Sequence, residues 1–121
     1  MPANVKVILA QDFVRGTPEG QIYLEEAEKL LRDIAAAGAG LEGFDVLIDT
    51  RRVSAGLSAT ELWYLADKVA RLPRSEGRRI AILCPTERFD HSRFFALCAE
   101  NRGLNVAAFT SYEDAMEWLL E

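Results

Sequence analysis

An aspartate and four arginines follow two apolar runs of the sequence, and side chains of these types recognise anions and cations. The run VLI ends at Asp49 and precedes Arg51 and Arg52, whereas Arg88 and Arg93 follow the run RIAILC. If both runs are parallel strands, their carboxyl ends lie at one edge of the sheet, where open α/β sheets bind ligands. Guanidinium groups at such an edge bind a carboxylate or a phosphate. The sequence therefore suits an anion-binding edge made by the four arginines, and residues 49–60, which begin with Asp49, are the first place where function is expected.

The same arginines have a simpler interpretation as a solvated rim of the protein. Glu61, Glu87 and Asp90 are close to them in sequence and can pair with them, and arginines are mostly exposed in any protein. Asp49 can likewise pair with an arginine that follows it, or accept N–H groups of the next turn. Both interpretations stay open at this point.

Two hydroxyl groups lie where a helix is expected to begin. Ser58 with Glu61 three residues later forms the pattern of a capping box, and Leu57 with Leu62 forms that of a hydrophobic staple. Thr60 adds a second hydroxyl in the first turn. Because helix N-termini attract anions, Ser58 and Thr60 are candidate binding residues, although capping alone accounts for Ser58.

Trp63 and Tyr64 are consecutive residues of the same predicted helix. Both therefore cannot face the core equally, and one of them is expected at the surface or in an interface. Amphipathic aromatic side chains are common at protein interfaces. We therefore predict that this pair contacts a protein partner or a second copy of the chain.

The sequence predicts no catalytic residue, no metal site and no cofactor. His91 is the only histidine, and its sequence neighbours in a helix would not face it, so nothing orients it for catalysis. Cys84 and Cys98 are too far apart for a CxxC motif. They are typical of free, buried thiols in a reducing compartment.

Length and composition indicate a globular protein. A chain of 121 residues, 50% of them hydrophobic, is expected to form one domain that spans residues 1–121. Its net charge of −5 argues against nucleic acid and anionic membranes as partners. No apolar run approaches the ~20 residues of a membrane span, and the N-terminus lacks the pattern of a signal peptide. These features predict a cytoplasmic protein.

Strands and helices are predicted to alternate four times, which indicates an α/β domain with a four-stranded, mainly parallel sheet. The expected strands cover residues 5–10, 46–49, 79–84 and 106–109, with an extension or a hairpin arm at Phe13 and Val14. The expected helices cover residues 18–37 and 58–72, followed by two more that Asp90 and Ser111 cap. A progressive strand order would put all helices on one face and leave the other to an N-terminal segment or a second subunit. A doubly wound order would cover both faces with helices.

From about Phe44 onward the chain resembles the bacterial STAS-like, SpoIIAA-like domains, in FDVLIDTRRVS, LSATELWYLADKV, RRIAILCPTERFDHSRFFALCAENRGLNVAAF and YEDAMEWLLE. The resemblance implies a small βα superhelix, which fits the progressive order, and a regulatory or binding module. The anti-sigma-factor antagonists of that family carry Asp-Ser-Ser-Gly at the start of their second helix, where a partner kinase phosphorylates a Ser. The corresponding stretch here is Leu57-Ser58-Ala59-Thr60, which lacks the Asp, the Gly and the second Ser. The phosphorylation switch is therefore degenerate.

Two functions follow from these observations. The first is a non-catalytic regulatory module that presents residues 49–60 and the following helix to a protein partner, or to a second copy in a homodimer. The second is a small-molecule binder, in which an apolar cavity beneath the strand ends holds a lipid-like anion. The loop 85–89 would close that cavity, with Arg51, Arg52 and Arg88 at its mouth. An enzyme that uses His91 or Cys84 is a third hypothesis, and it is not expected.

Overall fold

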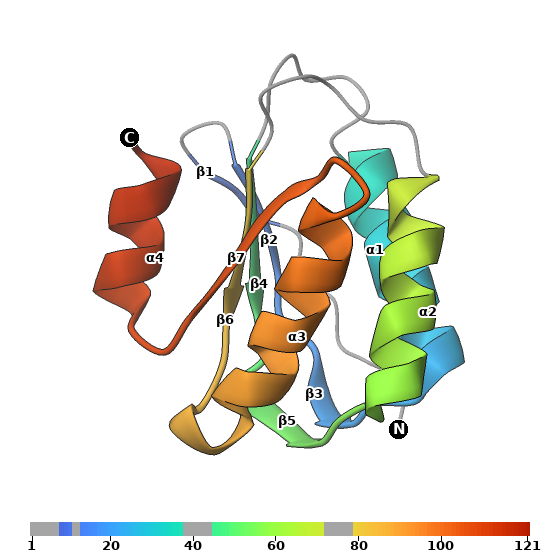
Figure 1. Ribbon diagram of the computed structural model, residues 1–121. Helices are drawn as coiled ribbons and strands as arrows, with labels where there is room; N and C mark the ends of the chain where they lie inside the picture. Colours follow the sequence, from blue (N-terminus) through green and yellow to red (C-terminus); the bar gives the residue numbers. More distant parts are fainter. Residues whose placement is uncertain (1–7, 11–12, 38–44, 72–78) are drawn as a thin grey trace.

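The computed structural model describes residues 8–10, 13–37, 45–71 and 79–121, and the described residues form three layers. The central layer is a five-stranded sheet made of β1 (Ile8–Ala10), β2 (Phe13–Gly16), β4 (Asp45–Asp49), β6 (Arg79–Leu83) and β7 (Asn105–Phe109). The outer layers are made of α1 (Leu24–Ala37), α2 (Ala59–Ala70), α3 (Phe89–Glu100) and α4 (Tyr112–Leu119). Helices α1, α2 and α3 lie on one face of the sheet and α4 on the other (Figure 1).

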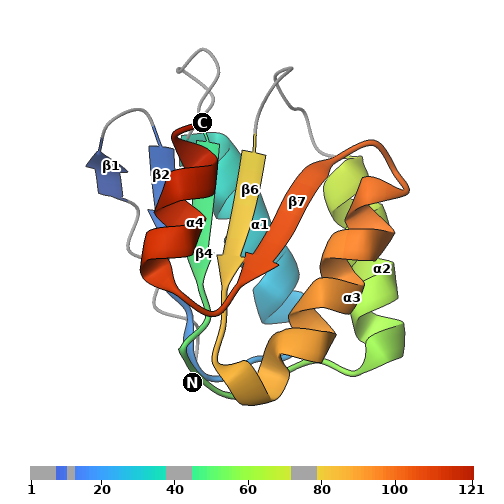
Figure 2. The same ribbon diagram turned by 60° about the vertical axis from the view of Figure 1, so that its left-hand side comes forward.

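The strand order is β1-β2-β4-β6-β7, and the four strands β2, β4, β6 and β7 are parallel (Figure 2). This confirms the predicted four-stranded parallel sheet. Of the two strand orders that the sequence left open, the structure has the progressive one. The expectation that residues 5–10 form the first parallel strand is wrong for the part described. Residues 8–10 form the antiparallel edge strand β1, and the parallel strand is β2, which pairs with β4. Residues 5–7 lie outside the described residues.

The central strands β4 and β6 bury side chains on both faces, which explains their continuous apolar runs. Under α1, α2 and α3 the sheet contributes alternate residues that include Val14, Val46, Ile48, Ile82 and Val106. The intervening residues, which include Phe13, Leu47, Ala81 and Leu83, pack against Ala115 and Leu119 of α4. The expectation that a progressive order leaves one face bare is therefore wrong. Helix α4 covers that face, so the sheet itself does not require a second subunit there.

A second, two-stranded parallel sheet lies in segments that were expected to be helix and turn. It consists of β3 (Glu19–Gln21) and β5 (Arg52–Ala55). The predicted start of the first helix near residue 18 is wrong, because Gly20 has a φ of 80°, in the left-handed region that a helix does not use. The backbone N–H of Ile22 then donates to the carbonyl of Ala55, and α1 begins at Leu24.

The ends of the helices show which of the predicted capping residues occupy the cap positions. The Ser58 capping box of α2 and the Ser111 cap of α4 are confirmed. Gly103 adopts the expected left-handed conformation after α3, with a φ of 87°. Asp90 is not the cap of α3, because the short 3-10 helix η1 (Thr86–Arg88) places Arg88 at that position. No helix in the described part of the chain is long and apolar enough to cross a membrane.

Candidate functional site

Asp49 ends β4 with its carboxylate buried, and two guanidinium groups converge on it. Its relative exposure is 4%. Arg51 donates from its backbone N–H at 3.1 Å and from Nε to Oδ1 at 3.0 Å, and its Nη2 donates to Oδ2 at 2.9 Å. Arg15 of β2 donates to Oδ2 at 3.1 Å. The guanidinium of Arg51 thus binds the carboxylate through both oxygens, and Arg15 of the adjacent strand β2 adds a further hydrogen bond.

Burial alone raises the pKa of the Asp49 carboxyl, but the hydrogen bonds and charge of Arg51 and the hydrogen bond of Arg15 outweigh it and hold that pKa below its usual value. The hydrogen bond to Asp49 likewise raises the pKa of Arg51. Asp49 is therefore ionised, and four hydrogen bonds within the chain engage its two oxygens. Its contacts fix the turn between β4 and β5.

Four arginines were expected at this edge, and the three expected at the mouth of an apolar cavity make different contacts. The fourth, Arg93, is exposed on α3 and does not line the cavity described below. Arg51 binds Asp49. Arg52, in β5, has a side chain that is 75% exposed and lies 3.8 Å from the carboxylate of Glu19. Arg88 is partly buried, and its Nη2 donates to the backbone carbonyl of Thr50 at 3.1 Å. Of the three, Arg88 alone lines the cavity described below.

The start of α2 places the two candidate hydroxyls at the surface. The Ser58 hydroxyl accepts from the N–H of Glu61 at 3.2 Å, and the Glu61 carboxylate accepts from the N–H of Ser58 at 3.0 Å. Thr60 is exposed in the first turn of the helix. The structure therefore gives Ser58 a capping role and leaves both residues accessible from solvent.

Large hydrophobic side chains are exposed on the adjacent helices α2 and α3. Trp63 and Tyr64 are 50% and 42% exposed, so both lie outside the buried face of α2, where only one was expected to do so. On α3, Phe94 is 38% and Leu97 is 50% exposed. Cations sit over the two aromatic rings of α2, with the guanidinium of Arg102 4.8 Å from the Trp63 ring centre and Lys68 Nζ 5.2 Å from that of Tyr64.

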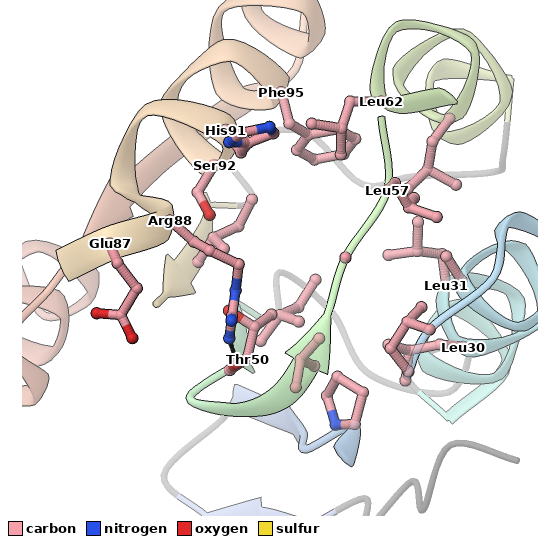
Figure 3. A pocket seen from close by; sticks show the side chains of 18 residues that line it. Leu30, Leu31, Thr50, Leu57, Leu62, Glu87, Arg88, His91, Ser92 and Phe95 are labelled. Carbon is pink, nitrogen blue, oxygen red and sulfur yellow. Dashed lines mark hydrogen bonds between the residues drawn. The ribbon is translucent and has the colours of Figure 1, made fainter. Parts of the chain in front are cut away.

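An apolar cavity of about 330 Å³ lies between α1, α2 and α3 at the carboxyl ends of β4 and β6 (Figure 3). We call it the helix-side cavity. Its walls include Leu30 and Leu31 of α1, Leu57 and Leu62 at the start of α2, and Phe95 of α3. Its position is the one at which open parallel sheets bind ligands.

Polar groups line one side of the helix-side cavity. They come from the end of β4 and from the η1–α3 segment, and they are Thr50, Glu87, Arg88, His91 and Ser92. The Thr50 hydroxyl donates to the carbonyl of Leu83 at 2.9 Å. The opposite side, from α1 and α2, is apolar.

Cys84 follows β6 and is fully buried. Burial raises the pKa of its thiol, and the opposing effects of a hydrogen bond from Ser92 and the charge of Arg88 are smaller. A thiol that is both buried and protonated at neutral pH is a poor nucleophile.

The sequence reasoning missed Arg15 as a partner of Asp49. The two residues are 34 positions apart, and only the pairing of β2 with β4 brings them together. The available signal was a single arginine inside the short apolar strand Phe13–Gly16, because a charge in such a place requires a charged partner. Phe94 and Leu97 were also not recognised as parts of an exposed surface.

Comparisons with known proteins identify the fold. No protein-family model and no curated protein sequence match the chain. Among solved structures, the chain is similar to an uncharacterised DUF3478-family protein with a SpoIIAA-like fold from Shewanella loihica PV-4, with a TM-score of 0.61 and 18% identity. It is also similar to an anti-sigma factor antagonist from Mycobacterium paratuberculosis, with a TM-score of 0.62 and 20% identity. Each match covers 98% of this chain and 94% of the other chain.

These two structures match 98% of the chain, whereas the sequence resemblance began at about Phe44 and matched the N-terminal third only in outline. The progressive parallel sheet, with three helices on one face and α4 on the other, agrees with that result. The chain is therefore an α/β domain with a SpoIIAA-like fold.

Proposed function

We propose that this chain is a cytoplasmic, non-catalytic regulatory module that binds another protein through the outer faces of α2 and α3. The observation that carries this proposal is the exposure of Trp63, Tyr64, Phe94 and Leu97 on two helices that pack against each other. Aromatic residues dominate the energetics of protein interfaces. Large apolar side chains that remain exposed on neighbouring helices are typical of an interaction surface.

The similarity to an anti-sigma factor antagonist supports the proposal, since that protein is named for its action on another protein. The similarity is limited to the fold, so it does not tell which class of protein binds this chain. Ser58 and Thr60, at the exposed start of α2, belong to the proposed contact surface. Asp49 and Arg51 support that surface indirectly, because they fix the turn that leads through β5 to α2.

The aromatic residues are held in place, which favours binding. Arg102 stacks on Trp63 and is itself fixed by Asp67, at 3.3 Å, and by the carbonyl of Cys98, at 2.9 Å. A side chain that is already ordered loses less conformational entropy when a partner binds. The same surface can bind a second copy of this chain, so a homodimer is one form of the proposal.

The test replaces Trp63 with Ser and Tyr64 with Lys in one variant. The control variant is Leu120→Lys, because Leu120 is 63% exposed at the end of α4, on the other side of the sheet. A photo-crosslinking amino acid is placed at position 63 or at position 120 in the organism that supplies the gene. Sedimentation velocity of the purified variants measures self-association.

We expect crosslinks to one defined protein, or to a second copy, from position 63 and none of that product from position 120. The double variant should lose the interaction and keep the circular dichroism of the wild type. An equal pattern of crosslinks from both positions, or an interaction that survives the double substitution, would show that the α2–α3 surface is not the binding surface.

A further inference from the structure

We propose that the helix-side cavity binds a small monocarboxylate with a compact apolar body, and that Arg88 receives the carboxylate. This proposal concerns a different part of the molecule from the α2–α3 surface and does not depend on a protein partner. Four observations carry it: the volume of the cavity, the polarity of its two sides, the contacts of Arg88 and the charge around its rim.

The volume sets the size of the ligand. An engineered protein cavity of about 150 Å³ accommodates benzene, with its six carbons. A cavity of about 330 Å³ has by proportion room for about a dozen non-hydrogen atoms. It is at the small end of the range for natural ligand sites. Nucleotides and long-chain fatty acids are larger than this, whereas an acid with eight to ten carbons, flexible or aromatic, fits.

The two sides of the cavity fix the orientation of that ligand. The α1 and α2 side, with Leu30, Leu31, Leu57 and Leu62, offers no group that can bind a charge. The polar residues are confined to the side formed by β4, η1 and the start of α3. Figure 3 shows Arg88 on one side of the cavity and the leucines Leu30, Leu31 and Leu57 on the other. A ligand that fits has one polar end, placed against Arg88, and an apolar body directed toward α1 and α2.

Arg88 is placed to receive that polar end. The Thr50 hydroxyl already donates to the carbonyl of Leu83. Arg88 uses one N–H for the Thr50 carbonyl, and it forms no ion pair within the described part of the chain. A guanidinium has five N–H donors, so the remaining ones are available for a two-pronged contact with a carboxylate.

The side chain of Arg88 lies along the polar side of the cavity. Its Cδ lies 4.0 Å from the point where a Cβ on Gly56 would stand, so the side chain runs from η1 past the β5–α2 loop. Its bond to Thr50 extends it to the end of β4. The arginine thus spans the polar side of the cavity, where it can hold a carboxylate without leaving its present position.

Charge around the rim favours one negative charge over two. Glu87 precedes Arg88 and lines the same rim, and Asp90 is exposed two residues further on. A phosphate monoester carries close to two negative charges at neutral pH and would face these acids with one guanidinium to offset them. The planar carboxylate matches both the geometry and the charge of Arg88.

The test uses decanoate, which has twelve non-hydrogen atoms, and measures its dissociation constant by titration calorimetry with lipid-free protein. Arg88→Gln removes the proposed carboxylate contact. Arg93→Gln is the matched control, because Arg93 is an exposed arginine of α3 that does not line the cavity. Decanol, which keeps the apolar body and lacks the charge, is the control ligand.

We expect decanoate to bind the wild type and Arg93→Gln equally, and to bind Arg88→Gln at least tenfold more weakly. Decanol should bind wild type and Arg88→Gln alike. A second variant, Leu62→Phe, fills the apolar end and should also weaken decanoate binding at least tenfold while thermal unfolding shows that it is folded. The proposal is overturned if decanoate does not bind at millimolar concentration, if both arginine variants weaken it equally, or if Leu62→Phe leaves it unchanged.

Discussion

The buried Asp49 carboxylate allows a quantitative prediction about stability. Asp49→Asn keeps the shape of the side chain but removes the negative charge that pairs with Arg15 and Arg51. Hydrogen bonds to charged groups contribute about 1.5–3 kcal/mol each, and loss of one partner of a fully buried ion pair costs about 3–5 kcal/mol. The side chains of Arg15 and Arg51 are 31% and 46% exposed, so water compensates part of the loss. We expect the free energy of unfolding to fall by about 2–3 kcal/mol.

Urea denaturation and calorimetry measure this effect. For a domain of this length, each kcal/mol lowers Tm by about 4 °C, so we expect a decrease of about 8–12 °C. The control is Asp33→Asn, which removes an exposed carboxylate from the Lys29–Asp33 pair of α1. That variant should change stability by less than about 0.5 kcal/mol. The reasoning is refuted if the two substitutions cost the same.

The pH dependence gives an independent check of the same contact. In the folded protein the pKa of the Asp49 carboxyl lies below the ordinary aspartate value of about 3.9, which it keeps in the unfolded chain. The folded state therefore binds this proton more weakly, and the stabilisation is complete above about pH 4 and is lost as the pH falls through the folded-state pKa. The wild type should lose stability below about pH 4 more steeply than Asp49→Asn. Parallel acid profiles would contradict the assignment.

Three further predictions concern single residues. Ser58→Ala should lower the free energy of unfolding by about 1 kcal/mol, because it removes the hydroxyl that caps α2, whereas Ser58→Asp should retain most of the stability; equal losses in urea denaturation would contradict this. Gly20→Ala should cost about 1–2 kcal/mol, since its φ of 80° strains any other residue although no atom lies within 4 Å of the added Cβ. Gly56→Ala, at an ordinary backbone conformation, is its control and should be nearly neutral. Cys84 should resist iodoacetamide in the native protein at neutral pH and react in denaturant, as mass spectrometry can show; rapid native labelling would argue against a buried, protonated thiol.

Features that are formed by residues close to one another in the sequence could be predicted from it. The continuous apolar runs that became β4 and β6 indicated buried parallel strands, and the capping box at Ser58 marked the start of α2 to within one residue. The strands β3 and β5 contain three and four residues and carry no periodic pattern, so they were read as helix and turn. The start of α3 was misplaced because η1 adds a turn before it.

The site depended on contacts between distant segments, and sequence reasoning reached it incompletely. The apolar cavity and the role of Arg88 at its rim were hypotheses from the order of strands and loops, but Arg51 and Arg52 were assigned to the same place. Which arginine lines the cavity depends on side-chain direction in the turn after Asp49, where Arg51 folds back onto the carboxylate. Neither spacing nor composition encodes that choice.

The position of α4 has a consequence for synthesis of the protein. Translation produces β2, β4 and β6 before α4, and α4 alone among the described helices covers the sheet face that contains Leu47, Ala81 and Leu83. Until the ribosome has released α4, the nascent domain therefore exposes an apolar sheet surface in an otherwise largely assembled fold. Exposed surfaces of this kind make partly made chains prone to aggregation and attract chaperones. The docking of α4 is therefore the step after which this sheet face can no longer drive aggregation of the newly made chain.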